Sequence, residues 1–358
     1  MTSDPRLDAP PGLLARLLLR AAVRLLPLRG GLPRRDQLRR VLVVRTDDRL
    51  GNALLTVPLA LALREALPAA RIDLLLARRR AAVAEGLPRV RVVPFEKTDA
   101  FRHPLRFLRF LRELRRTGYD AVIDAAHWHA FSLTSALLSR WAARRFLVGA
   151  ERGAKDFYSR AIPPPPPLAP EIEAKLLLLT GLDLPAPARS VLQTPLGLDR
   201  MEWAATIAPG ARYVALNPGA RKPDHRWPLE RFAALARALG EQGVPSLVTW
   251  GPGEERLARA LVEQSAGASK LAPPSDVAEL AALFRRASLV IANDTGPMHL
   301  AAACGTPMVA LIHAPEGMRW THPGPRFVAL VAPGVQEVVA AARRLLDTAT
   351  GAVEPARP

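Results

Sequence analysis

The clearest chemistry in the sequence is expected at residues 293–307, which read NDTGPMHLAAACGTP. The apolar run before them, 288–292, predicts a buried strand, and the proline at 297 suits the first turn of a helix. Such a strand-to-helix junction offers free backbone N–H groups, and the helix dipole favours a phosphate there. The segment therefore predicts a diphosphate site, formed by Asp294, Thr295, Gly296 and His299. In the alternative interpretation, Asp294 or Thr295 only caps the helix and His299 is an ordinary buried histidine.

Two further polar loops follow predicted strands in the same half of the chain. The loop NPGARKPDHRWP, residues 217–228, places Lys222, His225 and Arg226 beside a glycine turn, where they could clamp phosphates. The turn GPGEE, residues 251–255, places Glu254 and Glu255 at a helix start, where they could accept hydrogen bonds from ribose or sugar hydroxyls. Simpler interpretations are a solvated basic loop and an acidic pair favoured by the helix dipole.

A third kind of candidate is a general base in the first half of the chain. The loop RTDDRLGN, residues 45–52, puts Asp47 and Asp48 at the carboxyl end of a predicted strand, beside a glycine turn. Aspartates that only form a turn are the alternative. His127 and His129 follow another predicted strand, so they border the same crevice or belong to the end of the sheet. Two histidines are too few for a metal site.

Several familiar chemistries are excluded by the absence of their motifs. The sequence holds no P-loop, no HExxH, no CxxC and no Asp-x-Asp metal pair, and its nearest approach to GxGxxG lacks the third glycine. A single cysteine, Cys304, leaves no internal disulfide possible.

The elements that must position these residues alternate between strands and helices. Short apolar runs separated by helical stretches, such as the one predicted near 53–67, predict parallel sheets. The runs of the first series are 41–44, 72–77, 90–93 and 121–126, and those of the second are 213–217, 246–250, 288–293 and 308–312. We therefore predict two doubly wound α/β domains. Their ranges are 41–184 for the first and 212–358 for the second, with a linker at 185–211 and an N-terminal extension at 1–40.

The charge of the chain is concentrated near its N-terminus. The net charge is +17, and residues 1–120 hold 25 basic against 12 acidic residues, an excess of 13. Such an excess suggests an anionic partner, whereas a solvated surface in an arginine-rich proteome is the plainer explanation. Aromatic residues make up only 5%, and no RNA or DNA motif is present, so no nucleic acid partner is expected.

The extension 1–40 predicts an amphipathic helix. Arg16, Arg20 and Arg24 recur at steps of four among leucines, and the apolar stretch is too short and too charged to span a bilayer. We expect either an interfacial membrane anchor or a cap packed on the core. The stretch 104–116 predicts a second, strongly basic helix, whose simplest explanation is a solvated face.

Taken together, these motifs make the chain resemble glycosyltransferase family 9, the lipopolysaccharide heptosyltransferases. The resemblance rests on RTDDRLGNALLTVP, YDAVID, NPGA with RWP, GPGEE and NDTGPMHLAAACGTP, in this order over roughly residues 40–345. It implies a GT-B fold, with two Rossmann-like domains facing a cleft. It also implies transfer of heptose from ADP-heptose with inversion and without a metal or other cofactor, by a cytoplasmic enzyme at the inner face of the inner membrane.

Carried over to this chain, the resemblance places the donor on the second domain, at the candidates already named there. It places the lipid-linked, phosphorylated glycan acceptor on the first domain, near Arg45, Arg49, Asn52 and His127. Many members have Gly-Asp where this chain has Gly51 and Asn52, and asparagine cannot act as a base at neutral pH. Asp47 or Asp48 would then take that role. His225 stands where the family has a lysine, and Lys222 and Arg226 could substitute for it.

We therefore expect an inverting transferase that moves a heptose or similar sugar from an ADP-sugar to an inner-core lipopolysaccharide acceptor at an anionic membrane surface. The rival hypothesis is a non-catalytic protein that keeps the nucleotide pocket and binds a glycolipid or membrane, and Asn52 favours it.

Overall fold

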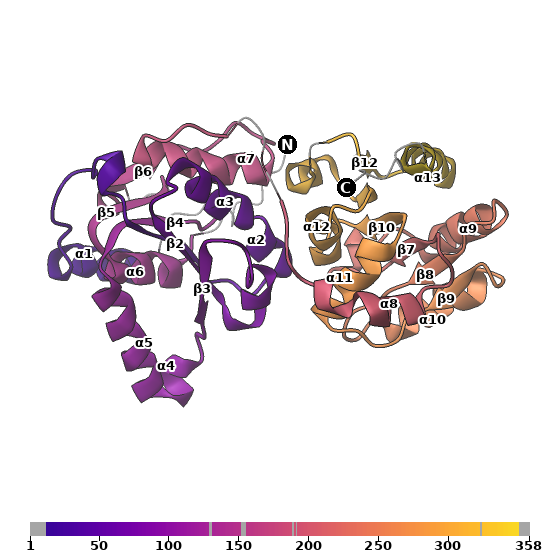
Figure 1. Ribbon diagram of the computed structural model, residues 1–358, viewed down its shortest axis with the longest axis horizontal. Coiled ribbons are helices and arrows are strands. Elements are labelled where there is room, and N and C mark those ends of the chain that lie inside the picture. Colours follow the sequence, from indigo (N-terminus) through magenta and orange to yellow (C-terminus); the bar gives the residue numbers. More distant parts are fainter. Residues whose placement is uncertain are drawn as a thin grey trace, which may run out of the picture. The chain divides into compact units, whose positions relative to one another are not determined.

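The computed structural model describes residues 12–128, 131–151, 155–187, 190, 192–322 and 324–350. The chain divides into two compact units, Met1–Val191 and Leu192–Pro358. Figure 1 shows the helices and strands of each.

The first unit is built on a parallel sheet of six strands in the order β3-β2-β1-β4-β5-β6. Four of these strands coincide with the predicted apolar runs. The other two were not predicted, because β5 has two arginines at its second and third positions and β6 has only three residues. The strands are β1 (Arg40–Arg45), β2 (Arg71–Ala77), β3 (Val90–Phe95), β4 (Tyr119–Asp124), β5 (Ala143–Ala150) and β6 (Arg160–Ile162).

Helices α1, α5 and α6 pack together on the first unit's sheet (Figure 1). Leu19 and Ala22 of α1 and Leu114 of α5 join one hydrophobic cluster with Val44 and Val122 of the strands. The predicted helix 53–67 is two helices, because Pro58 starts a new one. The helices are α1 (Leu13–Leu25), α2 (Leu50–Leu54), α3 (Val57–Ala66), α4 (Asp99–Arg102), α5 (Pro104–Thr117), α6 (Leu133–Ala142) and α7 (Glu171–Leu176).

The second unit repeats the winding of the first. Its sheet has the order β12-β11-β10-β7-β8-β9, which is the same connectivity of six parallel strands. The short strand β9 and the half-buried strand β12 were not predicted. The strands are β7 (Val214–Asn217), β8 (Ser246–Val248), β9 (Ser269–Leu271), β10 (Leu289–Asn293), β11 (Met308–Ile312) and β12 (Phe327–Val331).

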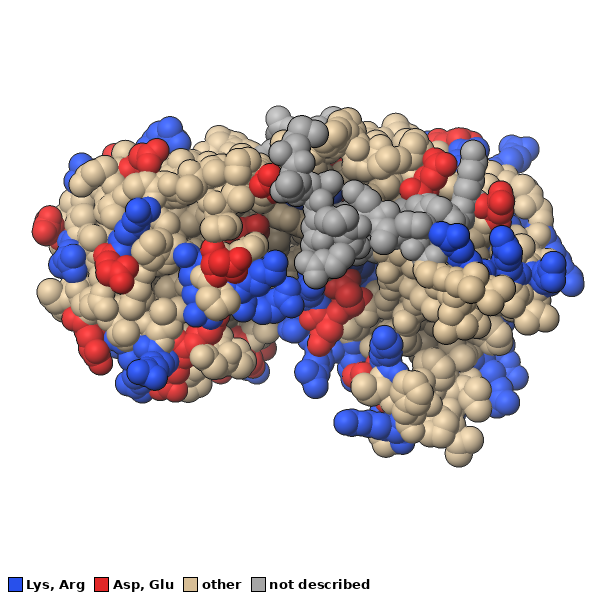
Figure 2. Space-filling view, turned by 180° about the vertical axis from the view of Figure 1, so that it is seen from behind, with Lys and Arg blue, Asp and Glu red and all other residues tan. Residues whose placement is uncertain are grey.

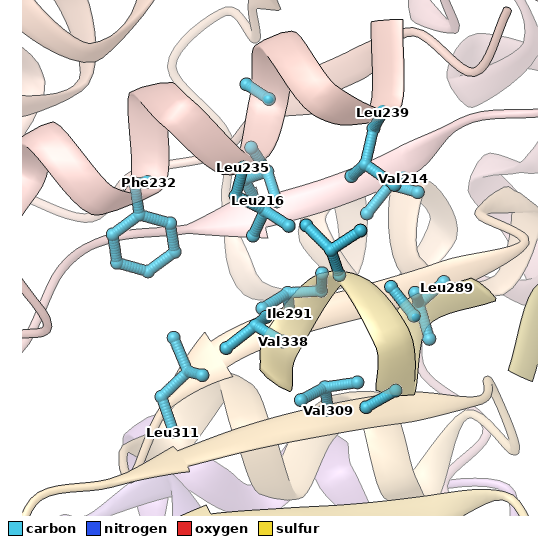
Figure 3. Packing of buried hydrophobic residues seen from close by; sticks show 14 of the residues in the cluster. Val214, Leu216, Phe232, Leu235, Leu239, Leu289, Ile291, Val309, Leu311 and Val338 are labelled. Atoms are coloured by element: carbon cyan, nitrogen blue, oxygen red, sulfur yellow. The ribbon is translucent and has the colours of Figure 1, made fainter. Parts of the chain in front are cut away.

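One face of this sheet is covered by α9 and α13, whose apolar residues fill the core (Figure 3). Phe232 and Leu235 of α9 and Val338 of α13 lie against Leu216 of β7 and Ile291 of β10. Residues 185–211, expected to be a linker, contain α8, which packs on α11. The helices are α8 (Met201–Ile207), α9 (Leu229–Gly240), α10 (Glu255–Gln264), α11 (Val277–Arg286), α12 (Gly296–Ala303) and α13 (Val335–Thr350).

The strand orders fix where ligand sites are expected. In each sheet the order reverses between two central neighbours, β1 and β4 in the first unit and β7 and β10 in the second. Loops that leave the carboxyl ends of such strands diverge and leave a crevice in doubly wound folds. Asp47 follows β1, the 217–228 loop follows β7, and Asp294 follows β10.

Candidate functional site

In the first unit, the carboxylate of Asp47 is held from several sides directly after β1. Its Oδ1 accepts hydrogen bonds from the Asn52 side-chain amide at 2.7 Å and from the Arg49 backbone N–H at 3.2 Å. Its Oδ2 lies 2.5 Å from Nε of Arg45. The Asp47 side chain remains 37% exposed, so the carboxylate is fixed in place and still reachable.

Arg45 connects Asp47 to a buried chain of charged and polar groups. The guanidinium of Arg45 contacts Nε2 of His127 and donates to the Ala125 carbonyl at 2.7 Å. Nδ1 of His127 lies 2.6 Å from Oε1 of Glu171. Lys175, one turn further along α7, lies 3.2 Å from the same oxygen. The side chains of Arg45, Glu171 and Lys175 are at most 2% exposed.

Burial dominates the protonation of this chain of groups. It lowers the pKa of His127 well below its usual value and, despite Glu171, lowers the pKa of Lys175 to about 8. His127 is therefore neutral at pH 7, and with Nε2 facing the Arg45 cation its proton belongs on Nδ1, toward Glu171. Arg45 and His127, predicted on the acceptor side, are thus buried: Arg45 contacts Asp47, and His127 contacts Arg45.

Asp48, the other predicted base, is in a different setting. It is 52% exposed and lies 3.2 Å from Nε of Arg80, which also donates to its backbone carbonyl. Arg49 is exposed beside it. The geometry therefore distinguishes two residues that the sequence left equivalent. His129 lies outside the described residues.

In the second unit, Asn293 ties two of the predicted loops together at the end of β10. Its Oδ1 accepts the backbone N–H of Trp227 at 2.9 Å, and its Nδ2 donates to the carbonyl of Pro218 at 2.9 Å. The Asn217 side chain donates from Nδ2 to the carbonyl and to the hydroxyl of Thr249, which joins the ends of β7 and β8. Predicted donor segments far apart in the sequence are therefore held side by side.

The β10–α12 junction has the predicted form. Thr295 stands at the N-cap of α12, but its hydroxyl donates to the Asn293 carbonyl rather than capping the helix. Burial raises the pKa of Asp294 to about 6. Gly317 lies so close that a Cβ there would sit 3.2 Å from Oδ2 of Asp294.

His299 lies on the buried side of α12 and is paired with a second histidine. Its Nδ1 lies 3.0 Å from Nε2 of His322, which burial keeps neutral by lowering its pKa to about 4. His322 was not predicted as part of the site, since its position 23 residues away gives no sequence signal.

The basic loop after β7 borders a small pocket of about 120 Å³. The ring of His225 stacks on His313, with ring centres 5.2 Å apart, and Arg226 donates to the Ala220 carbonyl. Burial lowers the pKa of His225, so its ring is neutral at pH 7 and Lys222 and Arg226 supply the positive charge. The pocket is lined by His225–Pro228, Arg231, Asn293, Leu311–His313, Ala332 and Pro333.

Glu254 and Glu255 have separate roles in the structure. The Glu254 carboxylate accepts the Gly251 backbone N–H at 3.0 Å and covers Gly219, where a Cβ would overlap it. Glu255 points elsewhere and forms an exposed ion pair with Arg259, at 2.6 Å. Of the two, Glu254 is the one beside the 217–228 loop.

The described part of the chain contains neither a candidate metal site nor a candidate membrane-spanning helix. Within it, no group of three or more His, Cys, Asp or Glu side chains is arranged to hold a metal ion. None of the described helices combines the length and apolarity needed to cross a bilayer.

Comparison with known proteins identifies the family. The family described as Glycosyltransferase family 9 (heptosyltransferase) matches residues 107–332, more than half of the chain. The chain belongs to glycosyltransferase family 9. This family 9 enzyme is 30% identical over 285 residues to lipopolysaccharide heptosyltransferase 1 of Pseudomonas aeruginosa, covering 76% of this chain and 78% of its relative. The resemblance seen in the sequence is confirmed.

Solved structures of family 9 glycosyltransferases share the fold. One from Veillonella parvula superposes with a TM-score of 0.72 at 22% identity, covering 87% of this chain and 97% of the other. E. coli heptosyltransferase WaaC with ADP-2-deoxy-2-fluoro heptose gives 0.66 at 24%, covering 86% and 99%. The GT-B fold class, two parallel-sheet α/β domains, is therefore confirmed for this glycosyltransferase.

Proposed function

We propose that this glycosyltransferase moves a heptose from ADP-heptose to a lipid-linked, phosphorylated inner-core lipopolysaccharide acceptor, with inversion and without a metal or other cofactor. The observation that carries the proposal is the family match, supported by a relative named lipopolysaccharide heptosyltransferase 1 and by a WaaC structure that holds an ADP-heptose analogue. We place the reaction in the cytoplasm, at the inner membrane.

In the proposed reaction, Asp47 takes the proton of the acceptor hydroxyl while that oxygen bonds to the anomeric carbon. The bond from this carbon to the β-phosphate oxygen breaks, and ADP leaves with the electron pair. Negative charge grows on the diphosphate, where fixed positive groups lower the barrier most. The N-terminus of α12, Lys222 and Arg226 are the groups proposed to stabilise it.

In this proposal, the asparagine at position 52 is compatible with an active transferase. Its amide donates to Asp47, so the asparagine orients the base instead of acting as one. The non-catalytic alternative rested on Asn52, and this hydrogen bond weakens that support. Release of ADP from ADP-heptose in the presence of a deep-rough lipopolysaccharide acceptor tests the choice. Absence of release from a protein that still binds ADP would favour the non-catalytic protein.

The close approach of Glu254 to Gly219 gives a sharp test of the donor site. In Gly219→Ala the new methyl group displaces the Glu254 carboxylate, since the flexible side chain yields more easily than the backbone. Losing a hydrogen bond to a charged group costs about 1.5–3 kcal/mol. We expect ADP-heptose to bind roughly 10 to 100 times more weakly, by isothermal titration calorimetry, and Glu254→Gln to behave similarly.

Gly210→Ala is the matched control, because a Cβ there meets only one atom, the Arg212 carbonyl oxygen at 3.9 Å. Unchanged binding in G219A would remove Glu254 from the donor site.

The raised pKa of Asp294 predicts a pH-dependent stability difference. Its pKa in the folded chain is about 6, above the ordinary value of 3.8, so the folded state favours the neutral carboxyl. The stability that this preference contributes is therefore fully present below pH 4 and is lost as the pH rises through 6. Asp294→Asn keeps the side chain neutral at every pH. We expect D294N and the native chain to be about equally stable at pH 4, and D294N to be more stable than the native chain by roughly 1–3 kcal/mol at pH 7.

Urea denaturation of the full chain at both pH values measures this difference. An equal effect of D294N at pH 4 and pH 7 would show that the Asp294 carboxyl titrates normally.

A further inference from the structure

Large hydrophobic side chains are unevenly exposed in the described part of the chain. Twelve are exposed there, and eight of them lie on α1, α4 and α5, which together hold 31 residues. Scattered exposed hydrophobic residues are ordinary, whereas a cluster marks a surface that meets a partner. The eight are Leu13, Leu14, Leu17, Leu18, Leu25, Phe101, Leu105 and Leu108.

Helix α1 has more apolar surface than the fold uses. Leu19 and Ala22 are buried in the hydrophobic cluster of the first unit. A second apolar stripe faces away from this contact, because residues three, four and seven apart share one side of a helix. It is bordered by the arginines at 16, 20 and 24. The helix therefore caps the core, which was one of the two expectations, and it also keeps an exposed apolar stripe, formed by Leu14, Leu17, Leu18 and Leu25.

Helices α4 and α5 form a projection from the first unit (Figure 1). Phe101 is 87% exposed and Leu105 79%, although both are large apolar side chains. Exposed arginines surround them, and Figure 2 shows the projection as mainly tan and blue at the lower right. A solvated basic face does not explain why phenylalanine and leucine lie at its most exposed point. The arginines are Arg102, Arg109, Arg112 and Arg116.

The two apolar regions belong to one side of the first unit. Helices α1 and α5 both contact α6, and both contribute to the same hydrophobic cluster. Both helices therefore pack on the same side of this unit, and their exposed apolar residues lie on the sides of the helices that are turned away from the core.

Charge decides what kind of partner this surface fits. Helices α1, α4 and α5 contain nine arginines and two acidic residues, Asp99 and Glu113. Asp99 is already paired with Arg106. A second copy of the chain would set arginines against arginines, which opposes association. An anionic bilayer offers apolar chains to the leucines and phosphates to the arginines, over an area that covers both regions.

We propose that α1 and the α4–α5 projection form one surface that binds an anionic lipid bilayer, with the leucines and Phe101 in the interface and the arginines at the headgroups. Long arginine side chains reach the headgroups while their stems lie along apolar surface. The inference goes beyond the proposed reaction, and it rests on the proposed function only in that a lipid-linked acceptor gives the surface a purpose.

Flotation of the full chain with vesicles tests the proposal without any transfer assay. Vesicles of phosphatidylethanolamine and phosphatidylglycerol are compared with vesicles of phosphatidylcholine. We expect binding to the anionic vesicles only, weakened by added salt. Arg109→Gln with Arg112→Gln is expected to weaken binding about 25-fold, since each arginine near an anionic surface contributes about fivefold. Phe101→Gln with Leu105→Gln, and Leu14→Gln with Leu18→Gln, are each expected to weaken it tenfold or more.

Leu198→Gln is the matched control, because Leu198 is 60% exposed but lies in the second unit. Equal binding of all variants, or of anionic and neutral vesicles, would overturn the proposal. A change of molecular mass in solution for the leucine variants, without vesicle binding by the native chain, would assign the surface to a protein contact instead. We expect ADP binding to be unchanged in all of these variants. If the native chain binds the anionic vesicles but transfers no sugar, the proposed reaction is wrong and the proposed membrane surface stands.

Discussion

Replacement of Asp47 by asparagine is expected to slow sugar transfer by a factor of roughly 10² to 10⁴, the usual contribution of a general base. Asparagine has the same shape but accepts no proton at neutral pH. Because Asp47 lies in the first unit, we expect D47N to bind ADP as tightly as the native chain does. The measurement is ADP release from ADP-heptose under saturating donor and acceptor, with ADP affinity determined by calorimetry.

Asp48→Asn is the matched control, since it makes the same chemical change one residue away. The Asp48 side chain is 52% exposed and paired with Arg80, so we expect D48N to keep nearly full activity. Full activity in D47N together with loss in D48N would reverse the assignment. Full activity in both would show that neither aspartate is the base.

The second large effect concerns stability. Glu171→Gln removes the carboxylate that lies against both His127 and Lys175, and it leaves the buried Lys175 amine without this ionic partner. Breaking a buried ion pair from one side costs about 3–5 kcal/mol, because the remaining charge has lost its compensation. We expect E171Q to lower the free energy of unfolding by that amount, measured by urea denaturation of the full chain. Transfer should also slow, since His127 would no longer be fixed against Arg45.

The control is Glu255→Gln, which breaks the exposed ion pair with Arg259. The two residues of this pair have the same i,i+4 spacing as Glu171 and Lys175. Such surface pairs contribute only about 0.3–0.5 kcal/mol. The double variant Glu171→Leu with Lys175→Met should recover much of the stability, because two apolar side chains replace the pair. If E171Q is as stable as E255Q, the buried network does not stabilise the first unit.

Most of the fold could be predicted because central strands of a parallel sheet are buried on both faces and read as continuous apolar runs. β1, β4, β7 and β10 all have this form. Four strands toward the sheet edges were not predicted. β6 and β9 have three residues each, β12 is only half buried, and two arginines interrupt the apolar run of β5. Helix α13 was not predicted, since the last predicted element is the strand at 308–312.

The candidate site could be predicted where its residues follow strands, as Asp47 and Asp294 do. Its supporting contacts could not, because they join distant parts of the chain. His127 meets Glu171 across 44 residues, and His225 stacks on His313 from another loop. The spacing of Glu171 and Lys175 at i and i+4 marks a helical ion pair, but it cannot show that the pair is buried beneath a candidate base.

The cover that Glu254 forms over Gly219 also constrains how sequences of this kind can change. A side chain at position 219 requires that the Glu254 carboxylate move away or that position 254 carry a smaller group. The two positions are therefore epistatic: once residue 254 is shorter, alanine at 219 meets no overlap, whereas alanine at 219 beside Glu254 displaces the carboxylate. Across related chains, we expect any residue larger than glycine at 219 to be accompanied by the loss of glutamate at 254.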